Sequence, residues 1–229
     1  MHETVPSKIT LTFDNGPTPG VTDQVLDALA QRQMSAMFFV VGQNVRTPAG
    51  RRLVDRAVRE GHRIGNHSYT HGLPLGELPP AQAVHEISST QALLDDFANI
   101  DRYFRPWGTE GALEPRCLNQ TAVDYLVAEK FTCVLWNSVP RDWADSGGWV
   151  SRALADTRSH QHTVVVLHDL PTGAMEHLPR FLDELTDSGV EVATQLPDDC
   201  VPIVRGRMRT PLDHLTAQPT IAADWRAES

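Results

Sequence analysis

The sequence lacks a long apolar segment and an export signal. Its first residues, MHETVPSKIT, have neither the basic start nor the apolar stretch of a signal peptide, and no run is long and apolar enough to span a bilayer. Low-complexity linkers and internal repeats are also absent. We therefore expect a cytoplasmic protein without a membrane partner.

Cysteine is scarce. Cys117, Cys133 and Cys200 are odd in number and widely spaced, which excludes a disulfide framework and a zinc-ribbon spacing. We expect all three to be reduced packing residues.

Basic residues are fewer than acidic ones. The chain carries 20 Lys and Arg against 29 Asp and Glu, a formal net charge of -9, and the acidic residues are dispersed. Such a surface repels nucleic acid and anionic membranes. We therefore expect no nucleic-acid partner and a neutral or cationic substrate.

The remaining composition is that of an ordinary globular protein. Hydrophobic residues make up 41% of the 229 residues, enough to bury one sizeable core. We expect a single catalytic domain over 1–229, with a motif core at about 8–200. The segment 201–229 is richer in Arg and Pro and only weakly periodic, which predicts a tail packed on that domain.

Apolar runs and helical spacings alternate along the chain. Short apolar runs predict strands at 8–13, 35–41, 62–66, 102–105, 131–136 and 163–168. Helical spacing predicts helices at 21–33, 49–60, 79–98, 119–130, 149–159 and 176–188. This alternation indicates an α/β fold with a parallel sheet, and by itself it leaves a barrel and a doubly wound sheet both open.

Polar clusters lie just past five of these predicted strands. Each has a local explanation, since Asp and Asn shape turns, Arg caps strands and histidines are often satisfied in the core. Parallel strands, however, present their carboxyl ends at one edge, where α/β enzymes build their sites. The five clusters, which together predict one site, read FDNGP, NHSYTH, FRPWG, RDW and LHD.

The order and content of these clusters resemble the five motifs of the polysaccharide deacetylases, the NodB-homology family of carbohydrate-esterase type, over residues 10–171. The resemblance implies a distorted (β/α) barrel of about seven strands with an open groove at the strand ends. It also implies a hydrolase of carbon–nitrogen amide bonds other than peptide bonds. Its substrate would be a small molecule or an oligosaccharide carrying an N-acetyl group, and a divalent metal, commonly zinc, would assist the reaction.

The same resemblance implies a role for each catalytic residue. Asp14 matches the base that takes a proton from the attacking water, and Arg105 matches the residue that orients this base. His168 matches the acid that protonates the leaving amine, and Asp142 matches the carboxylate that tunes this acid.

Metal and substrate residues are implied in the same way. His67 and His71 match two histidine ligands of the metal. Trp143 and Leu167 match walls of the pocket for the acetyl methyl group, and Trp107 matches a substrate-binding position whose backbone N–H helps to bind the oxyanion.

The chain departs from the family pattern at two places. Asn15 stands where the family has an aspartate as the third metal ligand; its neutral amide oxygen can still coordinate, but the loss of charge weakens binding. In the third motif, one proline precedes Trp107, and Glu110 and Glu114 follow. We expect an altered groove floor and a short substrate.

Two alternatives stay open. One is a metal-independent amidase that acts on a small cyclic or ureide-type amide. The other is a carbohydrate-binding homologue without catalysis, which the retention of both acid and base residues argues against.

Overall fold

The computed structural model describes residues 7–97 and 102–217. The predicted helix end at Ala98, the first six residues and the part of the predicted tail beyond residue 217 lie outside the described ranges.

Strand β1 (Lys8–Asp14) gives the sheet two different faces. Ile9, Leu11 and Phe13 belong to the largest apolar cluster, which lies between the sheet and the helices. Thr12 and Asp14 both accept hydrogen bonds from Arg105 on the opposite face. Because successive side chains of a strand point to opposite faces, one face of β1 builds the core and the other carries the polar site.

Seven parallel strands form most of the sheet. The order is β6, β1, β2, β3, β4, β5, and β7 also pairs with β1. Parallel hydrogen bonds between Ser138 and β6 carry the chain that follows β5 across to the other edge. The sheet therefore curls into a distorted half-barrel, which confirms the predicted fold class. The strands after β1 are β2 (Met37–Val40), β3 (Arg63–Asn66), β4 (Tyr103–Phe104), β5 (Thr132–Cys133), β6 (His162–His168) and β7 (Glu191–Val192).

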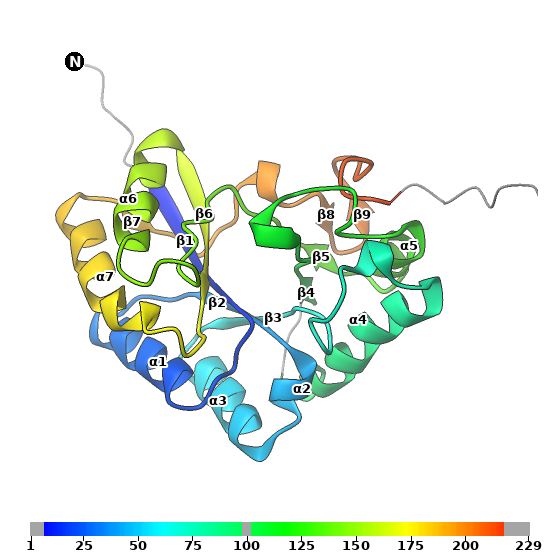
Figure 1. The fold of residues 1–229 in the computed structure, drawn as a ribbon, viewed down its shortest axis with the longest axis horizontal. Helices are drawn as coiled ribbons and strands as arrows, with labels where there is room; N and C mark the ends of the chain where they lie inside the picture. Colours follow the sequence, from blue (N-terminus) through cyan, green and yellow to red (C-terminus); the bar gives the residue numbers. More distant parts are fainter. Residues whose placement is uncertain (1–6, 98–101, 218–229) are drawn as a thin grey trace, which may run out of the picture.

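The helices lie around the outside of the curved sheet (Figure 1). Their arrangement on the outer face decides between the two architectures that periodicity had left open, because a doubly wound sheet carries helices on both faces. The helices are α1 (Val21–Gln31), α2 (Gly42–Val45), α3 (Pro48–Arg59), α4 (Pro80–Leu94), α5 (Gln120–Ala128), α6 (Trp149–Ser159) and α7 (Leu178–Asp187). All but the single-turn α2 were predicted, with ends that differ by a few residues.

The described part of the predicted tail adds two strands. β8 (Ile203–Val204) pairs antiparallel with β5, and β9 (Arg207–Met208) pairs antiparallel with β8. Gly206 takes a left-handed conformation in the turn between them, with φ +76. The tail therefore extends the sheet, which its weak periodicity did not predict.

All three cysteines are buried and free, as expected for packing residues. Burial raises the pKa of the Cys133 thiol to about 12. Among the described residues, no helix combines the length and the apolar character needed to cross a bilayer.

Candidate active site

A cavity of about 290 Å³ lies at the carboxyl ends of the parallel strands. Loops that follow different strands supply its walls, which explains how residues far apart in the sequence meet. The predicted residues that line it are Asp14, Asn15, His67, His71, Trp107, Trp143 and His168.

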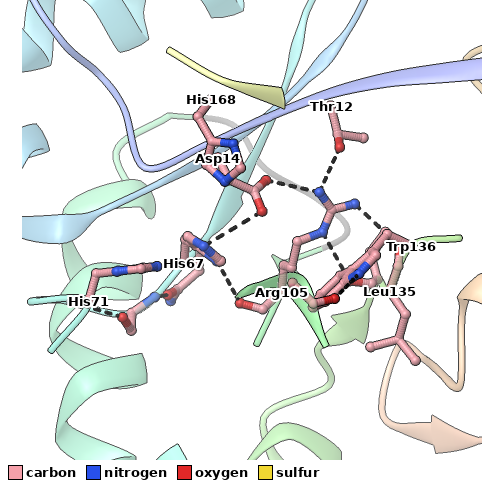
Figure 2. Close-up of polar contacts among 12 residues, drawn as sticks. Thr12, Asp14, His67, His71, Arg105, Leu135, Trp136 and His168 are labelled. Atoms are coloured by element: carbon pink, nitrogen blue, oxygen red, sulfur yellow. Dashed lines mark hydrogen bonds and ion pairs between the residues drawn. The ribbon is translucent and has the colours of Figure 1, made fainter. Parts of the chain in front are cut away.

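Asp14, which lines the cavity, forms a buried ion pair with Arg105. The Arg105 guanidinium donates to Asp14 Oδ1 over 2.9 Å and to Thr12 Oγ1 over 2.6 Å. Its other nitrogens donate to the carbonyls of Val134 and Leu135, each over 3.3 Å. Arg105 is fully buried and Asp14 is 3% exposed. A buried charge persists only when it is paired and hydrogen-bonded, and here Arg105 holds one oxygen of Asp14 and leaves Oδ2 toward His67 (Figure 2).

His168 forms a second charged pair with Asp142. Its Nδ1–H donates to Asp142 Oδ1 over 2.9 Å, and its backbone N–H donates to Asp142 Oδ2 over 2.8 Å. Burial alone would lower the pKa of His168, but the hydrogen bond and charge of Asp142, with the charge of Asp14, outweigh it and raise this pKa. Because Nδ1 is engaged, Nε2 is the nitrogen left for proton transfer.

His67 and His71 both present neutral imidazoles. His67 Nδ1–H donates to the Arg105 carbonyl over 2.9 Å, so Nε2 carries the lone pair, 3.6 Å from Asp14 Oδ2. The two rings lie 5.0 Å apart between centroids. Burial lowers the pKa of His67, and it lowers the pKa of His71 to about 3. Neutral imidazole is the form that binds a metal.

A carboxylate from α4 holds the histidine loop, and the sequence analysis missed it. Glu86 Oε2 accepts from the backbone N–H groups of Tyr69 and Thr70 over 2.9 and 2.8 Å. Ser68 Oγ accepts the N–H of His71 over 3.2 Å, and His71 itself has φ 52. No local signal marks Glu86, because α4 meets this loop only through the tertiary fold.

Asn15 lines the cavity with an unsatisfied acceptor. Its backbone is left-handed, with φ 76, a conformation that Asn tolerates better than most residues. The Asn15 carbonyl accepts from Asn44 Nδ2 over 2.9 Å, whereas the side-chain Oδ1 is buried without a hydrogen-bond partner. This oxygen is therefore free to accept a hydrogen bond or to coordinate a cation.

The donor set for a metal is therefore two neutral imidazoles and one amide oxygen. Over the residues that the structure describes, no group of three His, Cys, Asp or Glu is arranged to hold a metal ion. A third protein ligand beside His67 and His71 would have to be Asn15 Oδ1. The three atoms fit a divalent cation such as zinc in chemical type, with less charge than an aspartate would provide.

Aromatic rings build the walls. The Trp107 ring stacks on His71 with centroids 4.5 Å apart, and the Trp143 ring meets His168 edge-on at 4.8 Å. Both tryptophans were predicted to contact substrate. Four further wall residues were not predicted: Trp136, Val139, Val166 and Leu170.

The predicted position of Leu167 is wrong. Leu167 is fully buried in the apolar cluster under the helices, on the face of β6 opposite the cavity. Val166, two residues before His168, shares the face of His168 because side chains alternate along a strand. The strand period could have indicated Val166 from the sequence.

A second carboxyl group lies behind the site. Asp169 is 1% exposed, and its Oδ2 accepts from Thr22 Oγ1. Burial raises the pKa of Asp169 to about 6, although the Thr22 hydrogen bond opposes this shift. Gly16 lies directly against it, because a Cβ there would be 2.1 Å from Asp169 Oδ2.

Comparison with known proteins agrees with this geometry. The family model described as polysaccharide deacetylase matches residues 2–120. The peptidoglycan-N-acetylglucosamine deacetylase of Bacillus cereus is 32% identical over 81% of this chain and 85% of its own length. The peptidoglycan-N-acetylmuramic acid deacetylase PdaC of Bacillus subtilis is 28% identical over 81% of this chain, which spans 37% of that protein.

A solved structure shares the fold. The family 4 carbohydrate esterase from Streptomyces lividans, in complex with acetate, superposes with a TM-score of 0.70 at 29% identity over 85% of this chain and 96% of its own. The chain therefore belongs to the polysaccharide deacetylase family, a family of hydrolases.

Proposed function

We propose that this protein removes the acetyl group from an N-acetylated sugar or oligosaccharide by hydrolysing its amide bond. One observation carries the proposal: Asp14, held by Arg105, and His168, held by Asp142, line the same cavity. The family relatives act on N-acetylated glycans by name, which supports this substrate class.

The residues of the chain divide the proton transfers between them. Asp14 Oδ2 takes a proton from the attacking water, because Oδ1 is held by Arg105. His168, protonated through its pairing with Asp142, gives the proton on Nε2 to the leaving amine. Trp143 and Val166 provide an apolar surface for the acetyl methyl group.

A bound divalent metal, held by His67, His71 and Asn15 Oδ1, would polarise the acetamide carbonyl and lower the pKa of water. The orphaned Asn15 oxygen and the neutral histidines support this part of the proposal. The missing negative charge at position 15 supports the competing one, a metal-independent amidase with the same base and acid.

The catalytic roles are tested by acetate release from chitooligosaccharides. Asp14→Asn should lower kcat by about 10²- to 10⁴-fold, the usual contribution of a general base, with an unchanged fold by circular dichroism. Asp183→Asn is the control, because Asp183 forms an exposed pair with Arg32 on the outer helices. An Asp14→Asn enzyme with most of its activity would exclude Asp14 as the base.

Asn15→Asp separates the two mechanisms. An added carboxylate should raise zinc affinity at least about tenfold, equivalent to about 1.4 kcal/mol. Isothermal titration of both metal-free proteins with zinc measures this without turnover. If the wild type binds no zinc and stays fully active with excess chelator, the metal-assisted mechanism is wrong and the metal-independent amidase replaces it.

A further inference from the structure

One side of the active-site cavity is lined by a turn, residues 108–112, which we name the wall turn. It follows β4, and the segment that faces it, residues 136–141, follows β5. Glu110 and Gly111 from the wall turn line the cavity beside Trp136 and Val139. Two neighbouring strand-end loops therefore meet at the edge of the site.

Trp136 anchors the wall turn. Its indole N–H donates to the Gly111 carbonyl over 2.9 Å, and the Trp136 side chain is nearly buried. Gly111 packs its backbone directly on Val139, since a Cβ at this position would lie 2.6 Å from Val139 Cγ1. The φ of +79 at Gly111 is one that glycine adopts without strain. The contact is thus both hydrogen-bonded and close-packed.

The wall turn is also stiff in itself. The N–H of Gly111 donates to the Gly108 carbonyl and the N–H of Ala112 donates to the Thr109 carbonyl, each over 3.0 Å. Arg141 pairs with Glu110 over 3.1 Å at the outer rim, where both side chains are exposed. An exposed pair adds little, so the Trp136 hydrogen bond and the Val139 contact hold most of the turn in place.

A sugar placed with its acetamide group between Asp14 and His168 would meet the wall turn on the Trp136 side of the cavity. The cavity volume of about 290 Å³ is at the lower limit of ligand pockets, about 300 Å³. We propose that the wall turn restricts this enzyme to sugars at or next to the end of a short N-acetylated oligosaccharide, and excludes the interior of a polymer. The inference rests on the proposed deacetylase function.

Binding of oligomers of increasing length tests the role of the wall turn without turnover. Isothermal titration would measure Kd for N-acetylglucosamine and its linear oligomers up to the hexamer, on Asp14→Asn and independently on His168→Ala protein. If the wall turn blocks one side and the small cavity offers no further sugar positions on the other, Kd should change by less than about twofold beyond the trimer. An open groove would instead gain about threefold to tenfold per added sugar, the effect of one hydrogen bond at each new position.

Variants of the residues that hold the wall turn test whether this turn limits the length of the bound oligomer. Trp136→Phe combined with Arg141→Gln removes the indole donor and the outer pair, so longer oligomers should gain affinity in this double variant. The matched control is Trp149→Phe combined with Arg180→Gln. Trp149 Nε1 also donates to a backbone carbonyl, that of Ala174 in the core, over 3.1 Å, and Arg180 also forms an exposed pair, with Glu184 on α7. This control should keep the wild-type length dependence.

Acetate release from the wild type, with the lost acetyl group located by mass spectrometry, completes the test. Loss from a terminal or penultimate sugar supports the wall. Affinity that rises with every sugar to the hexamer, or loss first from interior sugars, would overturn it. Binding that levels off at the trimer without any acetate release would support the wall and overturn the catalytic function instead.

Discussion

At the scale of single residues, two carboxyl groups near His168 act in different ways: Asp142, and Asp169, which follows His168 in the chain. Asp142 is hydrogen-bonded to the His168 ring and stabilises the imidazolium form. Asp169 instead lies behind the catalytic loop, buried against Gly16 and hydrogen-bonded to Thr22. We therefore expect Asp142 to control the protonation of His168, the proposed acid, and Asp169 to affect the stability of the folded protein.

Asp142→Asn should move the alkaline limb of the pH–rate profile to lower pH. The Asp142 hydrogen bond and charge raise the pKa of His168 against burial, so the acid form survives to higher pH in the wild type. Without that charge the imidazole loses its proton earlier, and activity at neutral pH should fall about tenfold or more. The measurement is kcat/KM against pH, and superimposable profiles would rule out the acid role.

Asp169 should make folding depend on pH. Its pKa is about 6 in the folded protein against 3.8 for an unperturbed aspartate, so the folded state holds the proton more tightly than the unfolded chain. The protonated Asp169 carboxyl group therefore stabilises the folded protein fully at pH values below its pKa in the unfolded chain. This contribution is lost as the pH rises through its pKa in the folded protein. Between about pH 4 and pH 7, the free energy of unfolding should fall by about 2 kcal/mol relative to Asp169→Asn. Urea denaturation across this range measures it; parallel curves for the two proteins would contradict the assignment.

At the scale of elements, the loop after β1 is held from both sides. Backbone hydrogen bonds join it to β2, from Asn15 N–H to the Phe39 carbonyl and from Val41 N–H to the Gly16 carbonyl. On the side of β6, Asp169 packs against Gly16. The position of Asp14 therefore depends on three strands, which hold the proposed base in a defined place.

Gly16→Ala should displace this loop. The new Cβ would lie 2.1 Å from Asp169 Oδ2, which forces the loop and the carboxyl group apart. A shift of about 1 Å can cost about 10²-fold in rate, and overpacking costs about 1–3 kcal/mol in stability. Activity and urea denaturation measure the two effects. Gly147→Ala is the control, since its nearest neighbour would be 4.0 Å away, and equal losses in both variants would refute a specific clash.

At the scale of the whole molecule, the curled sheet brings together loops that are distant in sequence. The proposed metal ligands come from the ends of β1 and β3, so a bound cation would tie two loops that the unfolded chain leaves apart. Ligand binding to the folded state alone stabilises it.

Zinc should therefore raise the Tm. At about 100 times its Kd, a ligand adds about 2.7 kcal/mol, equivalent to about 5–10 °C for a chain of this size. Differential scanning calorimetry in zinc and in chelator would measure the shift, and His67→Ala should abolish it. An equal Tm for the wild type in both solutions would argue against the metal site.

Much of the fold was predictable from the sequence because its signals are local. The alternation of apolar and polar residues in β1, the stripe that α3 buries through Leu53, Val54 and Ala57, and the turn residues after each strand all act over a few positions. The six predicted strands and six predicted helices are present. The resemblance to the family supplied the barrel, because periodicity alone does not report how far a sheet curls.

The sequence by itself determined which polar residues follow the strands and therefore which of them could line the cavity. Only the tertiary structure decided how they are used: that Arg105 is fully buried against Asp14, and that Glu86 on α4 holds the histidine loop. It also decided that the loops after β4 and β5 meet through Trp136 and Gly111, which both line the cavity. The physical reason is range. Strand and helix preferences arise between near neighbours in the chain, whereas a cavity is bounded by contacts between residues that are neighbours only after the sheet has curled.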